Sequence, residues 1–580
     1  MDDARPAAVA CGMLTALALA HLLAAAGSAA SRAPASASAD SLTVRGVSRQ
    51  LAEYRASRIR NVRYELTLDV TRRDTATGRV VVRFDRAKGG DAILDFRGLR
   101  LGSPTVNGRA TALAGDGAHL RIPAALLRAG PNSVELDFAS AIAPAGASII
   151  RYHDSTDDTD YLYTLLVPSD ANALFPCFDQ PDLKARVTLT LVTPRGWKAL
   201  GNGALAGSDS AGASTTTHRF RQSDPISTYL VAFAAGPWAT RTAMVRGRPV
   251  SLWARASRMK DVEVDTLIAT NARALEWLER YTARPFPFQK FDFLLAPAFP
   301  FGGMEHPGAV FYNEESFIYR EPPTRTQLLG REATIYHEVS HQWFGDLVTM
   351  RWFDDLWLKE GFATYISAVM QDDLSPHASA WRSFFLRNKP AAYATDASRG
   401  TTPVWQSLAN LDQAKSNYGA IVYNKAPGIL KQLDYLVGDT VFRDGLRAYL
   451  AAHAYGNATW TDLLDAIGGD GKPDPARARA DLAQWGRQYI LRPGIPVITQ
   501  RVVPQPGGWS LTLTQAPAQP LSGPASWPIR TRVLVVDSGG ASRTIPMLLT
   551  SAHTIRTFTG PLPAMVFANA GDQAYALVHL

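Results

Sequence analysis

The chain has 580 residues, of which 46% are hydrophobic and 19% charged, and a single hydrophobic core rarely organises a globular chain of this length. We therefore expect about three folded parts. The formal net charge is +8, but the Lys and Arg residues are dispersed without a dense basic run, so the composition gives little support for a nucleic-acid partner.

The first thirty residues have the order of a secretory leader. Arg5 precedes an apolar, Ala- and Leu-rich stretch over residues 7–26, and the small residues Ser28 and Ala30 follow it. We predict a signal peptide over residues 1–30 and an exported protein, periplasmic or extracellular after cleavage. The alternative is a chain anchored to the membrane by this segment. No later segment is apolar for long enough to span a bilayer, so we expect no stable membrane insertion of the mature chain.

After a linker over residues 31–46, a hydrophobic period of two predicts β-strands. The clearest alternation places apolar side chains at Val62, Tyr64, Leu66, Leu68 and Val70. Further strands are predicted at residues 79–84, 133–138 and 187–192, with turn-forming residues between them. The small residues of 207–217 predict an exposed loop. Residues 47–240 are therefore predicted to form an antiparallel β domain.

The hydrophobic period then becomes helical, which predicts a mainly helical domain over residues 241–493. Apolar residues recur at spacings of mostly three to five at Val262, Leu267, Ile268, Ala272, Leu275 and Leu278. A short strand is predicted at 291–295, and further helices continue to about Ile490. Alternation returns after Pro493 and Pro496, so we assign residues 494–580 to a small β-sandwich. The predicted fold class is multidomain α+β.

A metal-binding pattern lies in the helix-compatible segment 331–344. His337 and His341 are four residues apart, so both imidazoles lie on one helical face, with Glu338 beside them. A catalytic zinc takes three protein ligands and keeps one position open, and Glu360 offers a carboxylate from a second predicted helix. We predict one zinc ion per chain held by His337, His341 and Glu360, with Glu338 as the base that activates water.

The sequence around these residues resembles a known family. HEVSHQWFGDLVT at 337–349 continues into WLKEGFA at 357–363, and this arrangement is similar to the aminopeptidase N family of gluzincin zinc metallopeptidases, which also contains leukotriene hydrolase. FPCFD at 175–179 and GGME at 302–305 resemble two further signatures of that family. The resemblance implies a thermolysin-like catalytic domain between the two β domains. It also implies a bacterial-type exported member without the large helical C-terminal domain of many relatives.

The GGME segment is predicted to bind substrate. Gly302 and Gly303 permit close approach of the backbone, so an extended peptide can pair with this strip, which continues into Met304, as an added strand. The resemblance implies that Glu305 binds the free α-ammonium group of the substrate, and this contact explains cleavage one residue from the N-terminus.

Tyr423, in the run IVYNK at 421–425, is the predicted donor to the oxyanion of the tetrahedral intermediate. The zinc ion alone need not neutralise that oxygen, so a second donor is expected on its other side. The resemblance places a Tyr in this role, and Tyr418 is a second candidate.

Together these features predict a zinc metallo-aminopeptidase that releases N-terminal amino acids from peptides. Three residues depart from the family pattern: His306 replaces the usual Asn, Leu165 replaces an amine-contacting Gln, and Val167 occupies a position that is often acidic. These exchanges remove polar groups expected around the substrate amine. Two alternatives therefore stay open: a zinc hydrolase with altered substrate choice, and a catalytically silent binding module. The preferred side chain, the physiological substrate and the oligomeric state do not follow from the sequence.

Overall fold

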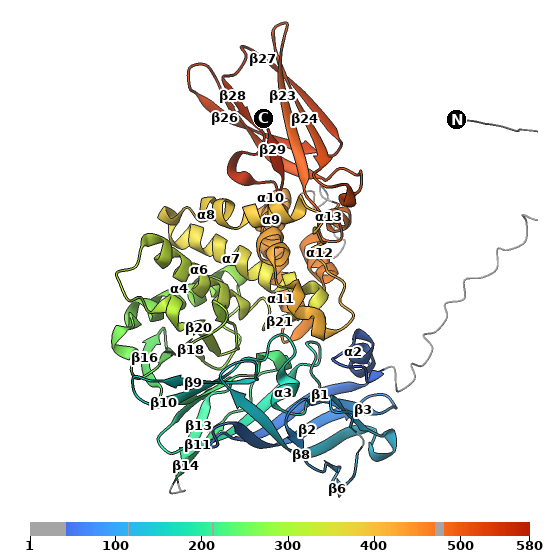
Figure 1. Ribbon diagram of the computed structural model, residues 1–580. Helices are drawn as coiled ribbons and strands as arrows, with labels where there is room; N and C mark the ends of the chain where they lie inside the picture. The colour runs from blue at the N-terminus through green and yellow to red at the C-terminus, as the bar shows by residue number, and fades with distance from the viewer. Residues whose placement is uncertain (1–41, 114, 211–213, 470–480) are drawn as a thin grey trace, which may run out of the picture. The chain divides into compact units, whose positions relative to one another are not determined.

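The computed structural model describes residues 42–113, 115–210, 214–469 and 481–580 (Figure 1). The predicted signal peptide and most of the predicted linker lie outside these residues. Within the described ranges, no helix is both long and apolar enough to cross a membrane. The predicted fold class is confirmed: a β-rich N-terminal part, a mainly helical middle part and a C-terminal part of two small sheets.

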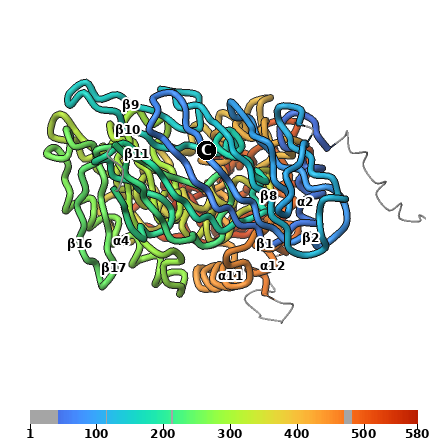
Figure 2. The backbone as a smooth tube through the Cα atoms, turned by 90° about the horizontal axis from the view of Figure 1, so that it is seen from below, coloured from blue at the N-terminus to red at the C-terminus, as the bar shows by residue number. Residues whose placement is uncertain are grey.

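A large sheet forms the N-terminal part, with 13 strands among the described residues. Its main path runs β12 (Lys198–Gly201), β15 (Phe233–Gly236), β10 (Thr159–Thr164), β9 (Ile149–Asp154), β8 (Gly130–Ala143), β2 (Thr75–Arg86), β1 (Ile59–Asp69), β11 (Ala185–Pro194), β14 (Thr215–Phe220) and β13 (Leu205–Asp209). Figure 2 shows β1, β2, β8 and β11 side by side. In β1 the side chains of Val62, Tyr64, Leu66 and Leu68 are buried, and those between them are exposed. The predicted period of two therefore reflects one buried face.

Most neighbouring strands of this sheet run antiparallel, as predicted, but two pairs are parallel. β1 pairs in parallel with β11, and β8 pairs in parallel with β9. Alternation reports which face a side chain occupies and carries no information on strand direction, so these pairs could not be predicted. The segment predicted as a loop over 207–217 also contains the end of β13 and the start of β14. Every residue of β13 is exposed, which leaves no hydrophobic alternation to detect.

The middle part begins with a five-stranded sheet in the described chain, in the order β16 (Ala239–Val245), β17 (Arg248–Ala254), β18 (Phe291–Ala296), β20 (Ala309–Asn313) and β19 (Gly303–Met304). β19 is an edge strand, paired with β20 alone among the described strands. β16 spans the predicted boundary at 240/241, and the predicted domain boundaries stay predictions.

The middle part also contains a two-stranded sheet of β21 (Val348–Met350) and β22 (Gly456–Ala458). Helices make up most of the rest (Figure 1). They are α4 (Val264–Thr282), α5 (Glu314–Phe317), α6 (Arg325–His341), α7 (Glu360–Leu374), α8 (Ala380–Arg387), α9 (Lys389–Asp396), α10 (Ala426–Val437), α11 (Asp439–Ala452), α12 (Trp460–Gly468) and α13 (Leu482–Tyr489). A capping box lies at the start of α6. The side chains of Thr324 and Gln327 each accept a hydrogen bond from the backbone N–H of the other residue. α6 packs against α7, which brings the end of α6 next to the start of α7.

Two small sheets form the C-terminal part. One contains β27 (His553–Thr559), β24 (Gly508–Pro517), β23 (Pro496–Gln505) and β29 (Leu577–His579), and the other contains β26 (Ser542–Leu549), β25 (Ile529–Val536) and β28 (Met565–Phe567). Burial alternates along β25, where Val533 and Val535 are buried. This pattern confirms the β structure that alternation predicted for the segment after Pro496.

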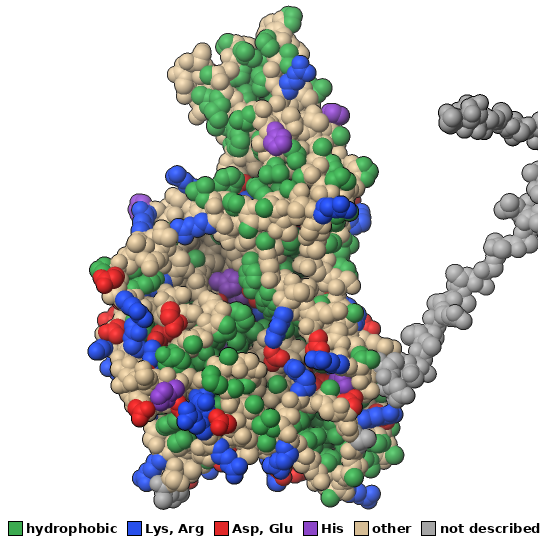
Figure 3. Space-filling model, in the orientation of Figure 1, with side chains coloured by type: hydrophobic (Ala, Val, Ile, Leu, Met, Phe, Trp, Pro, Cys, Tyr) green, Lys and Arg blue, Asp and Glu red, His purple; other side chains and the backbone are tan. Residues whose placement is uncertain are grey.

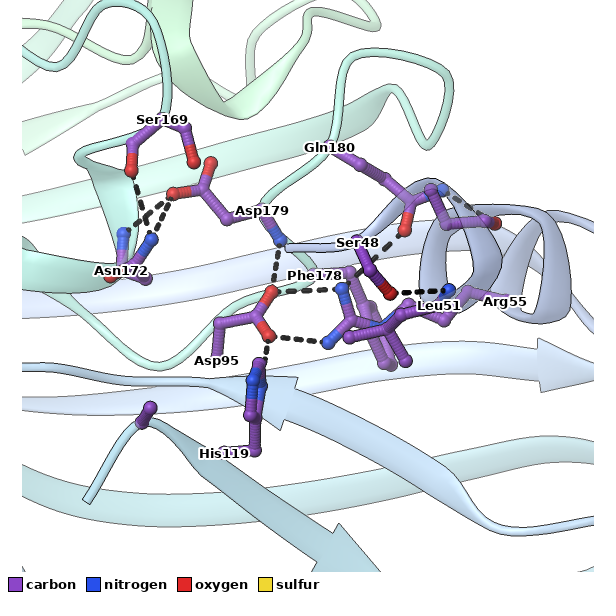
Figure 4. A network of polar contacts seen from close by, with 12 residues as sticks. Ser48, Leu51, Arg55, Asp95, His119, Ser169, Asn172, Phe178, Asp179 and Gln180 are labelled. Carbon is purple, nitrogen blue, oxygen red and sulfur yellow. Dashed lines mark hydrogen bonds and ion pairs between the residues drawn. The ribbon is translucent and has the colours of Figure 1, made fainter. Parts of the chain in front are cut away.

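A buried ion-pair network ties α2 (Arg49–Ala56) to β3 (Ala92–Asp95) and β7 (His119–Ile122) in the N-terminal part (Figure 4). Arg55 Nη1 donates to Asp95 Oδ2 at 2.8 Å, and His119 Nδ1 lies 2.8 Å from Asp95 Oδ1. The backbone N–H of Asp179 donates to Asp95 Oδ2 at 2.9 Å. Burial tends to raise the pKa of Asp95, but Arg55 and His119 outweigh it and the pKa is lowered. The FPCFD motif at 175–179 therefore joins this buried network through the backbone of Asp179.

Asp95→Asn is expected to lower the free energy of unfolding of the N-terminal part by about 3 to 5 kcal/mol, because Arg55 would stay buried without a carboxylate partner. Hydrogen exchange of the β1 and β3 amides in increasing urea measures this change. The matched control is Asp137→Asn, since Asp137 pairs with Arg79 on the surface and both side chains are more than half exposed. An exposed pair contributes less than about 1 kcal/mol. Equal losses in the two variants would contradict a special role for the buried pair.

Candidate metal centre

Three side chains from α6 and α7 converge at one point. His337 and His341 occupy successive turns of α6, and their Nε2 atoms lie 3.1 Å apart. Glu360 is the first residue of α7, and its Oε2 lies 3.2 Å from His337 Nε2 and 3.4 Å from His341 Nε2. The helical spacing and the contact between the two helices therefore bring together the three residues predicted as ligands.

This triangle of donor atoms fits a zinc ion. Zinc–nitrogen and zinc–oxygen bonds of about 2.0 to 2.1 Å in a tetrahedral site place neighbouring ligand atoms about 3.3 Å apart, close to the observed separations. His341 Nδ1 lies 3.0 Å from the Phe344 carbonyl oxygen and donates a hydrogen bond to it. The Nε2 atom of His341 therefore keeps its lone pair, which faces His337 Nε2 and Glu360 Oε2. A cation among these three atoms would accept the lone pair of His341 Nε2 and offset the charge of the Glu360 carboxylate. His337, His341 and Glu360 form a group able to hold a metal ion.

Glu338 lies beside this group and is 5% exposed. One of its carboxylate oxygens is within 4.8 Å of ligand atoms of Glu305 and His341. Burial, then the neighbouring carboxylates of Glu305 and Glu360, raise the pKa of Glu338 well above its usual value. The positive charge of a bound metal ion acts in the opposite direction.

The edge strand β19 runs directly against Glu338. A Cβ atom at Gly303 would lie 2.6 Å from Glu338 Oε1, so no larger side chain fits at this position without displacing the carboxylate. Because β19 pairs only with β20, its other edge is unpaired by any described strand. An extended peptide can therefore add to this edge and lie next to Glu338.

Lys359 is a buried charge that sequence reasoning missed. Its Nζ forms an ion pair with Glu305 and lies 2.9 Å from Glu360 Oε1. Burial alone would lower the pKa of Lys359, but the carboxylates of Glu305 and Glu360 outweigh it and raise the pKa well above its usual value. The signal available in the sequence is that Lys359 directly precedes the predicted ligand Glu360, whereas its burial is visible only in the structure. Lys359 thus links the predicted amine-binding residue to the predicted metal ligand.

The two candidate tyrosines both line the cavity that contains this group. Tyr423 belongs to η7 (Ile421–Lys425), a single π-helical turn, and its ring centroid is 6.3 Å from that of His337. Tyr418 lies 6.4 Å from Tyr423 by the same measure, and no described residue bonds its hydroxyl. Burial, followed by the charge of Glu360, raises the pKa of Tyr423 well above its usual value. Tyr423 therefore keeps its proton as a hydrogen-bond donor.

A cavity of 740 Å³ joins these elements, and every residue predicted for the site lines it: Gly302, Gly303, Met304, Glu305, His337, Glu338, His341, Glu360 and Tyr423. Figure 3 shows a hollow in this face of the molecule, with a histidine side chain visible inside it. Of the departures from the family pattern, Val167 lines the cavity, whereas Leu165 and His306 are not among its lining residues. Burial lowers the pKa of His306 to about 4, so this side chain is neutral at neutral pH.

Comparisons with known proteins agree with this geometry. A model of the peptidase family M1 domain matches residues 267–481, and a model of the peptidase M1 N-terminal domain matches residues 61–230. Aminopeptidase N of Streptomyces lividans is 31% identical over 568 residues, which covers 92% of this chain and 64% of that protein.

Two further relatives match a smaller share of the chain. Tricorn protease-interacting factor F2 of Thermoplasma volcanium is 30% identical over 65% of this chain and 46% of its own length. Aminopeptidase M1 of Arabidopsis thaliana is 30% identical over 60% of this chain and 39% of its own length. The chain thus spans less than two thirds of the length of each relative.

Proposed function

Because this chain belongs to peptidase family M1, the aminopeptidase N family, we propose that it is a zinc-dependent aminopeptidase that removes single residues from the free amino end of peptides. The observation that carries the proposal is the triangle of His337 Nε2, His341 Nε2 and Glu360 Oε2, with Glu338 beside it. The export predicted from the leader is part of the same proposal.

Glu338 is the proposed general base. A bound zinc ion would acidify water and polarise the scissile carbonyl group. Glu338 then takes the proton of the attacking water and passes it to the departing amine. Its place one residue after His337 on α6 holds its carboxylate in a fixed relation to the ligand set, which reduces the reorganisation needed during reaction.

Tyr423 is the proposed donor to the oxygen that becomes negative as the carbonyl carbon turns tetrahedral. Its ring lies beside that of His337, and both residues line the cavity. A hydroxyl that keeps its proton can donate a hydrogen bond whose strength grows as negative charge develops.

Glu305 is the proposed receptor for the substrate ammonium group. Its Oε1 pairs with Lys359, and no described residue donates a hydrogen bond to its Oε2. One carboxylate oxygen therefore stays available to a cation from the cavity. The charge-assisted bond formed there places the first peptide bond, and no later one, next to Glu338.

The experiment compares aminoacyl arylamides with a free amine against their N-acetylated equivalents, each with and without a chelator. We expect cleavage of the free substrates only, its loss on chelation and its return on addition of zinc. Equal cleavage of the acetylated substrates would contradict amine recognition and favour a zinc hydrolase of altered substrate choice. No cleavage of any substrate by zinc-loaded protein would favour a silent binding module.

A further inference from the structure

The turn that carries Tyr423 also carries a fully buried charge, on Lys425. Lys425 is 1% exposed, and its Nζ lies 2.9 Å from Asp396 Oδ2 and donates to the Gly494 carbonyl at 2.8 Å. Taking an ammonium group out of water is costly unless it is paired, so both partners must be in place when the chain folds. Gly494 lies just before β23, at the start of the C-terminal part. The turn η7 is thus tied directly to that part.

Asp396 connects the same turn to a second point of the C-terminal part. It is the last residue of α9 and is completely buried. Its Oδ2 accepts a hydrogen bond from Tyr575 Oη at 3.0 Å, and its Oδ1 accepts one from Thr401 Oγ1 at 2.8 Å. With Lys425, these groups satisfy the buried carboxylate. Tyr575 lies just before β29, so the C-terminal part supplies one of the groups that hold the partner of Lys425.

Tyr575 also fixes the helix that follows the turn. Its backbone N–H donates to Gln432 Oε1 on α10 at 2.7 Å. Its ring packs against Gly428 of α10, where a Cβ atom would lie 2.9 Å from Tyr575 Cδ2. Tyr575 therefore contacts α10 through both its backbone and its ring.

The other side of the turn rests on the helix of the metal ligand. A Cβ atom at Gly361 would lie 2.8 Å from Ala426 Cβ and 3.4 Å from the Val422 carbonyl oxygen. Gly361 directly follows Glu360. The turn that holds Tyr423 is consequently held between the start of α7 and the C-terminal part. π-Helical turns are rare and occur frequently at functional sites.

We propose that Lys425 is a positioning residue: its bonds to Asp396 and Gly494 fix η7 so that the Tyr423 hydroxyl meets the developing oxyanion. This inference rests on the proposed function, in which Tyr423 donates a hydrogen bond to the oxyanion. It makes the C-terminal β part a component of the catalytic apparatus, which neither the fold class nor the resemblance requires. A displacement of about 1 Å in a catalytic group can cost about 100-fold in rate, so a modest relaxation of the turn is sufficient.

A double-mutant cycle with Lys425→Met and Tyr423→Phe tests this role on free aminoacyl arylamides. Lys425→Met is expected to lower kcat by about 10- to 100-fold with KM changed less than about twofold and zinc content unchanged. Tyr423→Phe removes the donor and is expected to lower kcat by about 10²- to 10³-fold. In the Tyr423→Phe background, Lys425→Met should change kcat by less than about twofold, because no hydroxyl remains to be positioned.

Lys431→Met is the matched control. Lys431 is a second buried lysine, and it lies on α10. Its Nζ donates hydrogen bonds to the C-terminal part, at the carbonyls of Gly571 and Asp572 at 2.9 and 3.0 Å. Its loss is expected to leave kcat within about twofold of wild type, since these bonds do not involve η7. Tyr575→Phe provides a milder change if Lys425→Met does not fold: it deletes one hydrogen bond to Asp396 and should lower kcat without changing KM or zinc content.

Equal losses from Lys425→Met in the two backgrounds, or a loss from Lys431→Met as large as that from Lys425→Met, would overturn the inference. So would wild-type kcat in both Lys425→Met and Tyr575→Phe. These outcomes are distinct from failure of the proposed function, which would appear as wild-type protein that does not cleave free aminoacyl arylamides.

Discussion

Glu338→Gln is expected to lower kcat by about 10²- to 10⁴-fold, equivalent to about 3 to 5 kcal/mol of transition-state stabilisation, while one zinc ion stays bound per chain. The amide cannot accept the proton of water, whereas the ligand triangle of His337, His341 and Glu360 is untouched. Because glutamine matches glutamate in shape, it fits the space against Gly303. Steady-state kinetics on a free aminoacyl arylamide, with metal analysis of the same sample, measures both quantities.

Glu321→Gln serves as the control for the loss of one carboxylate. Glu321 is exposed, precedes the same helix and does not line the cavity. We expect this variant to keep the wild-type kcat and zinc content. Undiminished turnover in Glu338→Gln would rule out Glu338 as the base. Loss of both zinc and activity would instead indicate that Glu338 is a metal ligand.

Glu360→Gln is expected to abolish activity by a different route, through loss of the metal. It removes the one anionic ligand and leaves two neutral imidazoles to hold the ion. Loss of an outer-shell partner costs about 10- to 100-fold in metal affinity, and loss of a ligand should exceed that. Competition for zinc against a chromophoric chelator measures the affinity. Saturating zinc should restore part of the activity of Glu360→Gln and none of that of Glu338→Gln.

The contrast between these two variants separates binding of the metal from use of the metal. A Glu360→Gln protein that holds zinc as tightly as wild type would show that Glu360 is not a ligand. In that case the ion pair with Lys359, whose Nζ lies 2.9 Å from Glu360 Oε1, would account for the burial of this carboxylate.

The metal centre could be predicted because helical geometry alone sets much of it. Two histidines four residues apart must share a face of α6, and the same helix fixes Glu338 next to them. Glu360 could be predicted as the third ligand because it lies on the next predicted helix. The alternation in β1 likewise reports its buried face without any knowledge of its partners.

The remaining features depend on contacts between residues that are distant in sequence. Asp396 and Tyr575 are 179 positions apart and Lys359 and Glu305 are 54 apart, and no local pattern relates the members of either pair. The parallel pairing of β1 with β11 was hidden for the same reason. The FPCFD motif was recognisable, but its task of holding Asp95 through the Asp179 backbone became visible only with the fold.

The central claim is that one zinc ion is held by two imidazoles of α6 and one carboxylate of α7. X-ray data collected from crystals of the wild-type protein on both sides of the zinc absorption edge test it most directly. We predict a single strong anomalous peak per chain, within bonding distance of His337 Nε2, His341 Nε2 and Glu360 Oε2. A crystal grown with zinc that shows no peak there, or a peak whose ligands exclude Glu360, would contradict the claim.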